Sequence, residues 1–248
     1  MKSIYDKIGA TYAATRRPDP RIAARILKAL GDASSVVNVG AGAGSYEPTD
    51  RFVVAVEPSQ TMIRQRPQGS APAICAAAET LPFADAAFVA ALAVLTVHHW
   101  RDLARGLAEM RRVTQRRVVV LTWDQEVWES FWLIREYQPC IRGLDRLRSA
   151  PIQDIVSALG GGSIVAVPIP HDCVDGFHGA FWRRPEAYLD PRVRAGISTY
   201  ALMSPADLES GLRKLAGDLE SGLWTEQHRE LLELDELDLG YRLVIAQR

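Results

Sequence analysis

The sequence predicts an α/β fold, in which helices cover both faces of a mostly parallel β-sheet. Short apolar runs alternate with segments of helical periodicity through the first half of the chain. The runs are continuously apolar rather than alternating, which is typical of strands that are buried on both faces. Polar residues gather directly after these runs, where the carboxyl ends of parallel strands bind ligands in open α/β sheets.

The first half of the chain contains two helical patterns and five strand candidates. Apolar residues at helical spacing over 19–31 end at Gly31, and residues 101–113 form a second amphipathic pattern. The strand candidates are the apolar runs 36–39, 51–57, 72–79, 87–97 and 116–124. Strands that alternate with helices in this way are expected to form a parallel sheet.

The second half of the chain is less regular. Ser204 is a candidate N-cap for a helix that begins at Pro205. The other predicted elements are helices over 130–147 and 150–161 and strands over 164–169 and 241–248. Because no linker-like segment separates the halves, we predict one domain over residues 1–248, with an insertion between the fifth and sixth strands.

Charge and composition argue against several classes of partner. The chain of 248 residues has a formal net charge of -1, so no overall positive field attracts nucleic acid or an anionic membrane. Its three cysteines are far apart and lack zinc spacing, which predicts neither a disulfide framework nor a metal site. The chain starts without an apolar signal segment, and no apolar run is long enough to span a bilayer. We expect a cytoplasmic protein that acts as a monomer or a homodimer.

Three glycines, Gly40, Gly42 and Gly44, alternate with alanine directly after the first strand candidate. Glycine there permits a tight turn or a close approach to a ligand, and a purely structural turn is the alternative. Glu57 ends the second strand candidate, where a carboxylate can accept hydrogen bonds from both hydroxyls of a ribose. The glycine loop and this acid together predict a cofactor that contains a nucleoside, and both NAD and S-adenosylmethionine fit.

The residues that follow separate these two cofactors. Met62 lies one turn into the next predicted helix, in position to cover an adenine face, and "AETLPF" and "LTVHHW" flank the fourth strand candidate. Taken together, the motifs resemble the class I S-adenosylmethionine-dependent methyltransferases, in the small-molecule branch called type 11. The resemblance covers residues 5–124 and extends to a last strand, "YRLVIAQR".

The resemblance implies a Rossmann-like, seven-stranded, mostly parallel sheet with helices on both faces, an antiparallel last strand and a helical, aromatic cap insertion. It divides the predicted domain into four regions. These are lid helices (1–30), a cofactor-binding core (31–124), the cap insertion (125–163), and C-terminal strands with a substrate-side loop (164–248).

The resemblance also implies which residues hold the cofactor. The three glycines match the loop at its amino-acid end, and Glu57 matches the ribose-binding acid. The other implied contacts come from the lid, the adenine site and the methionine site: Tyr12, Arg16, Pro58, Met62, Ala78, Glu79, Ala93, Val94 and Leu95. The sequence departs from the family at Asn38, Ala77 and Val89, where an acid is frequent, and in "VTQRR", which stands in place of a frequent "LKPGG" before the fifth strand.

The catalytic candidates are two histidines, His98 after the fourth strand and His171 after the sixth. A neutral imidazole near the transferred methyl group can accept a proton from a substrate N–H or O–H, since its ordinary pKa is ~6.5. The alternative for His98 and its neighbour His99 is that they start a helix and pack locally. Methyl transfer needs no covalent intermediate, so no nucleophilic serine or cysteine is required.

Aromatic residues gather after the fifth strand and in the loop after the sixth. Trp128 and Trp132 are four residues apart and therefore share one face of a helix. They either belong to the core or form a flat wall above the active site. With Tyr5 from the lid, the predicted substrate contacts are Trp123, Trp128, Trp132, Asp172, Phe177 and Trp182.

The sequence thus predicts methyl transfer to a nitrogen or oxygen of a small, planar, heteroaromatic metabolite in specialised metabolism. A pteridine or azapteridine, such as a toxoflavin precursor, suits the aromatic residues. Two alternatives stay open from the residues alone: an NAD-dependent oxidoreductase, and a relative that binds the cofactor without catalysis.

Overall fold

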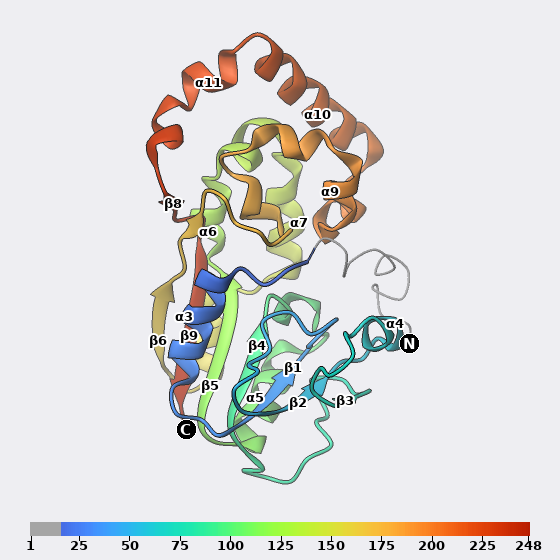
Figure 1. Cartoon of the computed structure of the whole chain (residues 1–248), viewed down its shortest axis with the longest axis vertical. Helices are drawn as coiled ribbons and strands as arrows, with labels where there is room; N and C mark the ends of the chain where they lie inside the picture. Colours follow the sequence, from blue (N-terminus) through green and yellow to red (C-terminus); the bar gives the residue numbers. More distant parts are fainter. Residues whose placement is uncertain (1–15) are drawn as a thin grey trace.

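The computed structural model describes residues 16–248, and a seven-stranded sheet forms its centre (Figure 1). The strand order is β3-β2-β1-β4-β5-β9-β6. The first five pair in parallel, whereas β9 runs antiparallel to both β5 and β6. The strands are β1 (Ser35–Val39), β2 (Phe52–Val56), β3 (Ala73–Ile74), β4 (Phe88–Val94), β5 (Thr114–Trp123), β6 (Ser163–Ala166) and β9 (Tyr241–Gln247). This topology confirms the predicted mostly parallel sheet with an antiparallel last strand.

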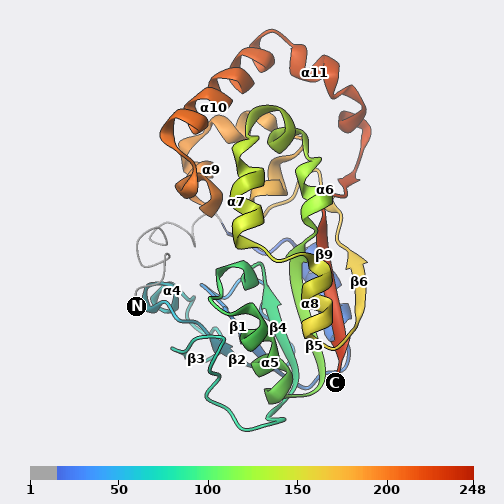
Figure 2. The same ribbon diagram turned by 180° about the vertical axis from the view of Figure 1, so that it is seen from behind.

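Helices cover both faces of the sheet, as the continuous apolar strands predict. α3 (Pro20–Leu30) lies in front of the sheet in Figure 1, and α5 (Leu103–Val113) and α8 (Ile152–Ala158) lie in front in Figure 2. Successive strand residues point to opposite faces, so Val36 packs in the core under α3 and Val37 in the core under α5 and α8. Both valines are fully buried.

A group of helices lies beyond the carboxyl ends of the strands, at the top of Figures 1 and 2, and we call it the helical cap. It draws on two segments of the chain, whereas the sequence predicted a cap from 125–163 alone. The first segment supplies α6 (Gln125–Glu129), the π-helical η3 (Leu133–Tyr137) and α7 (Cys140–Arg148). The second supplies η4 (His178–Phe181), η5 (Pro185–Leu189), α9 (Pro191–Ala195), η6 (Ser198–Leu202), α10 (Pro205–Glu220), α11 (Leu223–Gln227) and η7 (Arg229–Glu233).

Three predicted elements differ in extent from the structure. The strand expected over 164–169 is divided by Pro168 into β6 and a short β7 (Ile169–Pro170), which pairs with β8 (Glu236–Leu237) in a separate two-stranded sheet. The helix expected over 130–147 is interrupted before α7, because Pro139 has no N–H to continue it. The third strand candidate forms only the two residues of β3.

Local capping agrees with the sequence. Ser204 Oγ accepts a hydrogen bond of 3.1 Å from the Asp207 N–H, which confirms it as the N-cap of α10. Asp19 caps α3 in the same way, through the Arg21 N–H. Two short helical turns, α4 (Gln60–Arg64) and η2 (Val97–His99), follow β2 and β4. Within residues 16–248, no helix is both long enough and apolar enough to cross a bilayer.

Candidate active site

Two adjoining cavities lie at the carboxyl ends of the sheet strands, below the helical cap. Counted together with the open space at their mouths, the larger has a volume of about 1740 Å³ and the smaller one of about 540 Å³. Arg16 and Leu95 line both cavities, so the two spaces meet at these side chains. Ligands held in the two cavities would therefore face each other across this junction.

The glycine loop forms one wall of the larger cavity. The Gly40 and Ala41 N–H groups both donate to the Val56 carbonyl, at 2.8 and 3.0 Å, which ties the loop to the end of β2. Gly40 has a φ of +70°, and a Cβ there would lie only 2.1 Å from Thr96 Oγ1. Glycine is therefore required at position 40 both by backbone conformation and by space.

The Glu57 carboxylate is held rigidly beside this loop. It is buried, with Oε2 accepting from the Gly42 N–H at 2.9 Å and Oε1 accepting from the Ser59 N–H at 2.8 Å. Both backbone donors fix the orientation of the carboxylate in the larger cavity. Because each carboxylate oxygen can accept more than one hydrogen bond, Glu57 can also receive hydroxyl donors of a ligand.

Asn38, the departure from the family pattern, also lines the larger cavity. Its Nδ2 donates to Glu47 Oε1 at 3.1 Å, and Glu47 in turn pairs with Arg66 at 2.6 Å. Its Oδ1 is buried and has no hydrogen-bond partner within the described chain. The position thus offers a ligand an acceptor without a negative charge.

The other predicted cofactor contacts divide into three groups. The structure places Pro58, Met62, Ala78, Glu79 and Val94 on the wall of the larger cavity. Gly44 and Ala93 do not line it: Gly44 adjoins Arg66 and Glu47, and Ala93 is fully buried in the core under α5 and α8. Tyr12, like the predicted substrate contact Tyr5, lies outside the described residues.

The adjacent histidines of η2 face different cavities, His98 the smaller and His99 the larger. Their ring centroids are 3.7 Å apart, and the His98 ring meets the edge of Trp123 at 4.7 Å. Burial, reinforced by His99 and by Arg148 and Arg16, holds the pKa of His98 well below its ordinary value. Burial and Arg148 lower the pKa of His99 to about 3. Both imidazoles are therefore neutral at pH 7, and His98 holds a proton poorly.

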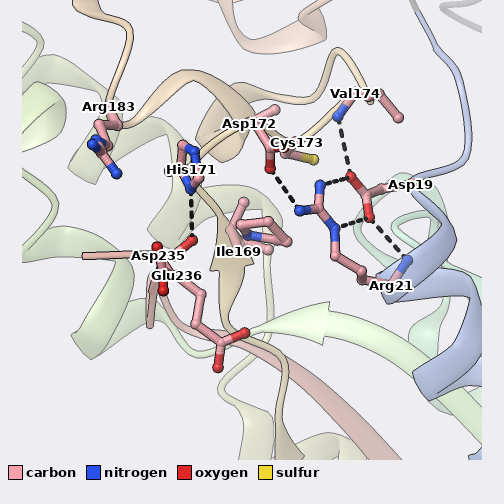
Figure 3. A network of polar contacts seen from close by, with 12 residues as sticks. Asp19, Arg21, Ile169, His171, Asp172, Cys173, Val174, Arg183, Asp235 and Glu236 are labelled. Carbon is pink, nitrogen blue, oxygen red and sulfur yellow. Dashed lines mark hydrogen bonds and ion pairs between the residues drawn. The ribbon is translucent and has the colours of Figure 1, made fainter. Parts of the chain in front are cut away.

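His171 and Asp172 line neither cavity, so the predicted roles of His171 as a catalytic base and of Asp172 as a substrate contact have no geometric support. Arg21 bridges Asp172 Oδ1 at 2.6 Å and Asp19 Oδ2 at 2.7 Å, and Asp19 also accepts from the Val174 N–H (Figure 3). His171 Nδ1 lies 3.1 Å from the Asp235 carbonyl. These contacts join the loop after β7 to the start of α3 and to Asp235.

Five of the predicted aromatic contacts lie within the described residues, and three of these line the smaller cavity: Trp123, Trp128 and Phe177. The other two belong to the core. Trp132 Nε1 donates to the Trp182 carbonyl and Trp182 Nε1 to the Ile169 carbonyl, each at 2.9 Å. The aromatic cluster is thus divided between a cavity wall and the core. The spacing of four residues does not predict which of Trp128 and Trp132 lines the cavity. The helix is broken between them, after α6 and before η3.

Sequence analysis missed Asp145, which projects from α7 into the smaller cavity. Its Oδ2 is buried and has no partner among the described residues. Burial, with a smaller contribution from Glu129, raises the pKa of Asp145 to about 6. A hydrogen bond from Trp128 and the charge of Arg148 lower the pKa, but by less. In the sequence, Asp145 lies between arginines, a pattern that is typical of a solvent-exposed helix face. The sequence therefore gives no sign that Asp145 lines a cavity.

Replacing Asp145 by asparagine is expected to stabilise the fold above pH 6. The folded state prefers the protonated carboxyl, so wild-type stability falls as the pH rises from the ordinary pKa near 3.8 through about 6. The full difference corresponds to about 3 kcal/mol, and partial solvent screening reduces the expected gain to about 1–2 kcal/mol. Urea denaturation at pH 4 and pH 8 tests this, since the gain must vanish at pH 4. Asp154→Asn, at an exposed carboxylate of α8, is the control.

Comparison with known proteins agrees with this geometry. A family model described as a methyltransferase domain matches residues 37–122. A protein from Anabaena variabilis ATCC 29413, assigned as a methyltransferase of an antibiotic biosynthesis pathway, is 34% identical to this chain. Its crystal structure superposes with a TM-score of 0.86, and the match covers 94% of this chain and 98% of that one.

More distant structures share the fold alone. The crystal structure of the cyclase SpnF is 14% identical, with a TM-score of 0.53 over 99% of this chain and 94% of that one. The comparison with curated proteins finds no match. Given the identity and coverage of the Anabaena protein and the match of the family model, the chain belongs to the class I S-adenosylmethionine-dependent methyltransferases.

Proposed function

We propose that this methyltransferase methylates a nitrogen or oxygen of a small, planar, heteroaromatic molecule held in the smaller cavity. The observation that carries this proposal is the junction of the two cavities at Arg16 and Leu95. An acceptor in the smaller cavity would face a cofactor in the larger one there. S-adenosylmethionine, when bound, supplies an electrophilic methyl group on its sulfonium sulfur.

The larger cavity fits S-adenosylmethionine in two observable respects. The unpartnered, buried Asn38 Oδ1 can accept a hydrogen from the amine at the methionine end. The Glu57 carboxylate, oriented by two backbone N–H groups, can accept the ribose hydroxyls. Gly40 leaves no room for a side chain, so the backbone itself forms the wall on that side.

The smaller cavity fits a flat acceptor. Its walls include Trp123, Trp128, Phe177 and Tyr241, whose faces can pack against an aromatic ring. Holding the acceptor and methyl group in line can by itself contribute ~7–11 kcal/mol to the rate.

Two further features support a role in specialised metabolism. The Anabaena relative carries an assignment to an antibiotic biosynthesis pathway. The aromatic walls of the smaller cavity suit fused nitrogen heterocycles, among which a pteridine or an azapteridine, such as a toxoflavin precursor, is our specific suggestion. We propose that the acceptor is such a metabolite rather than a macromolecule.

The assignment of Glu57 to the ribose predicts weaker cofactor binding in Glu57→Ala. Loss of the charge-assisted hydrogen bonds is expected to weaken binding of S-adenosylhomocysteine by about 1–3 kcal/mol in titration calorimetry. Glu109→Ala provides the control, because the Glu109 carboxylate is also held by a backbone N–H and by an arginine, but does not line the larger cavity. Equal affinity of the Glu57 variant and the wild type would contradict the ribose assignment.

The acceptor class is tested by release of S-adenosylhomocysteine from S-adenosylmethionine in the presence of planar heteroaromatic compounds. We expect turnover with fused bicyclic rings that carry N–H or O–H groups, and none with flexible aliphatic amines of equal size. In Trp128→Leu, which removes part of the aromatic wall, the KM for the acceptor should rise while S-adenosylhomocysteine affinity stays unchanged. A preference for aliphatic acceptors would overturn the proposal.

A further inference from the structure

The smaller cavity concentrates buried polar atoms that lack a partner. The described part of the chain contains nine buried side-chain polar atoms without a hydrogen bond, and four of them belong to residues that line this cavity. The four atoms are His98 Nδ1, Trp123 Nε1, Asp145 Oδ2 and His178 Nδ1. Folded proteins keep few such atoms because each is costly, so their concentration here indicates a ligand that completes them.

The hydrogen-bonding character of two of these atoms follows from their neighbours. Gln138 Nε2 donates to the Tyr200 hydroxyl at 2.9 Å, which turns its Oε1 toward His178 Nε2 at 3.2 Å. His178 Nε2 therefore carries the hydrogen. Because burial lowers the pKa of His178 to about 3, the ring is neutral and Nδ1 is an acceptor. Trp123 Nε1 can only donate.

Asp145 gives the smaller cavity its charge. Among the described residues that line the cavity, it is the one carboxylate, and Arg16, the one guanidinium, is already paired with Asp175 at 2.7 Å. An anionic acceptor would therefore be repelled. The complementary ligand is a neutral planar ring with hydrogens to donate to Asp145 and His178, and an acceptor atom for Trp123.

We propose that Asp145 is the catalytic base of this enzyme, and that the acceptor is a neutral heteroaromatic ring with an N–H that Asp145 contacts. This inference rests on the proposed function, which places the acceptor in the smaller cavity. In the reaction, a ring nitrogen lone pair forms the bond to the methyl carbon, and the carbon–sulfur bond breaks with its electrons left on sulfur. The ring N–H proton passes to Asp145 Oδ2.

Asp145 suits this role better than His98, which the sequence favoured. A base must hold the proton that it takes, and the protonated form of His98 is disfavoured by burial and by Arg148 and Arg16. The carboxyl of Asp145, with its pKa near 6, is ionised at pH 7 and close to the optimum for a general base. The titratable and charged groups around it are Arg16, His98, Glu129, Arg148, His178 and Tyr241.

The test follows the Asp145 carboxyl directly, by carbon NMR of protein labelled at the aspartate carboxyls and saturated with S-adenosylhomocysteine. Asp145→Asn identifies the resonance by its absence, and Asp154→Asn controls for loss of a carboxylate elsewhere. The probes are benzimidazole, which has a ring N–H, and 1-methylbenzimidazole, which lacks it. Binding of each probe is measured by calorimetry, and methyl transfer by release of S-adenosylhomocysteine from S-adenosylmethionine.

We expect benzimidazole to lower the titration midpoint of Asp145 and to bind about tenfold more tightly than its methylated analogue. This preference should disappear in Asp145→Asn, whose turnover should fall ~10²–10⁴-fold. The proposal is overturned if benzimidazole leaves the midpoint unchanged, if both probes bind equally, or if neither binds. A midpoint shift without any methyl transfer would sink the proposed function instead, while transfer without a shift would sink only the role of Asp145.

Discussion

Replacing Asp175 by alanine is expected to lower the free energy of unfolding by about 3–5 kcal/mol, because it leaves a buried guanidinium without its carboxylate. Asp175 is fully buried and binds Arg16 through both oxygens, at 2.7 and 3.1 Å. It also accepts a hydrogen bond from the Tyr46 hydroxyl at 2.9 Å. Since Arg16 lines both cavities, the same substitution should weaken S-adenosylhomocysteine binding.

Urea denaturation of the Asp175→Ala variant measures the effect, and two further variants isolate its cause. Asp172 lies in the same loop as Asp175, and Asp172→Ala breaks its exposed ion pair with Arg21 of α3. We expect this variant to change the free energy of unfolding little. A double variant, Arg16→Met with Asp175→Leu, removes both charges and should recover much of the lost stability. If the single and double variants were equally unstable, the cost would come from packing rather than from an unpaired charge.

The second large effect is expected in Gly40→Ala. The new Cβ would lie 2.1 Å from Thr96 Oγ1 and 2.8 Å from Thr96 Cγ2, and alanine at a φ of +70° adds backbone strain. Together these costs amount to about 2–4 kcal/mol. Because the loop must shift to relieve the clash, we expect S-adenosylhomocysteine affinity to fall by a similar free energy in calorimetry.

The clash and the strain can be separated. Gly69 also has a positive φ, of +85°, but a Cβ there meets nothing within 4 Å, so Gly69→Ala reports backbone strain alone. Adding Thr96→Ala to the Gly40 variant removes the two nearest atoms and should restore part of the stability. If Gly40→Ala cost no more than Gly69→Ala, close approach to Thr96 would not be the reason for this glycine.

The sheet was predictable because each of its central strands is buried on both faces and therefore leaves a continuous apolar run. β1, β2, β4 and β5 appear in the sequence for this reason. The weaker predictions fail where local signals compete. Pro168 divides the sixth strand, and the chain changes helix type before Pro139. The second segment of the helical cap escaped prediction because only tertiary packing joins it to the first.

The residues of the candidate site that directly follow a strand could be predicted, whereas those that reach it through tertiary packing could not. The glycine loop and Glu57 each follow a strand directly, so their position at the sheet edge follows from the strand itself. His171 and Asp172 also follow a strand, but Arg21 of α3 binds Asp172, and neither residue lines a cavity. Asp145 reaches the smaller cavity only because α7 packs against α6 and η3, and no neighbour in the sequence signals that packing.

Leu95, where the two cavities meet, has a left-handed backbone conformation with a φ of +49°. Such a conformation costs a non-glycine residue about 1–2 kcal/mol, so the backbone is strained at the junction of the two cavities. A change to glycine there would gain backbone freedom that offsets the lost side-chain packing. Evolution can therefore enlarge or reshape the acceptor space at this residue with less loss of stability than at neighbouring core positions.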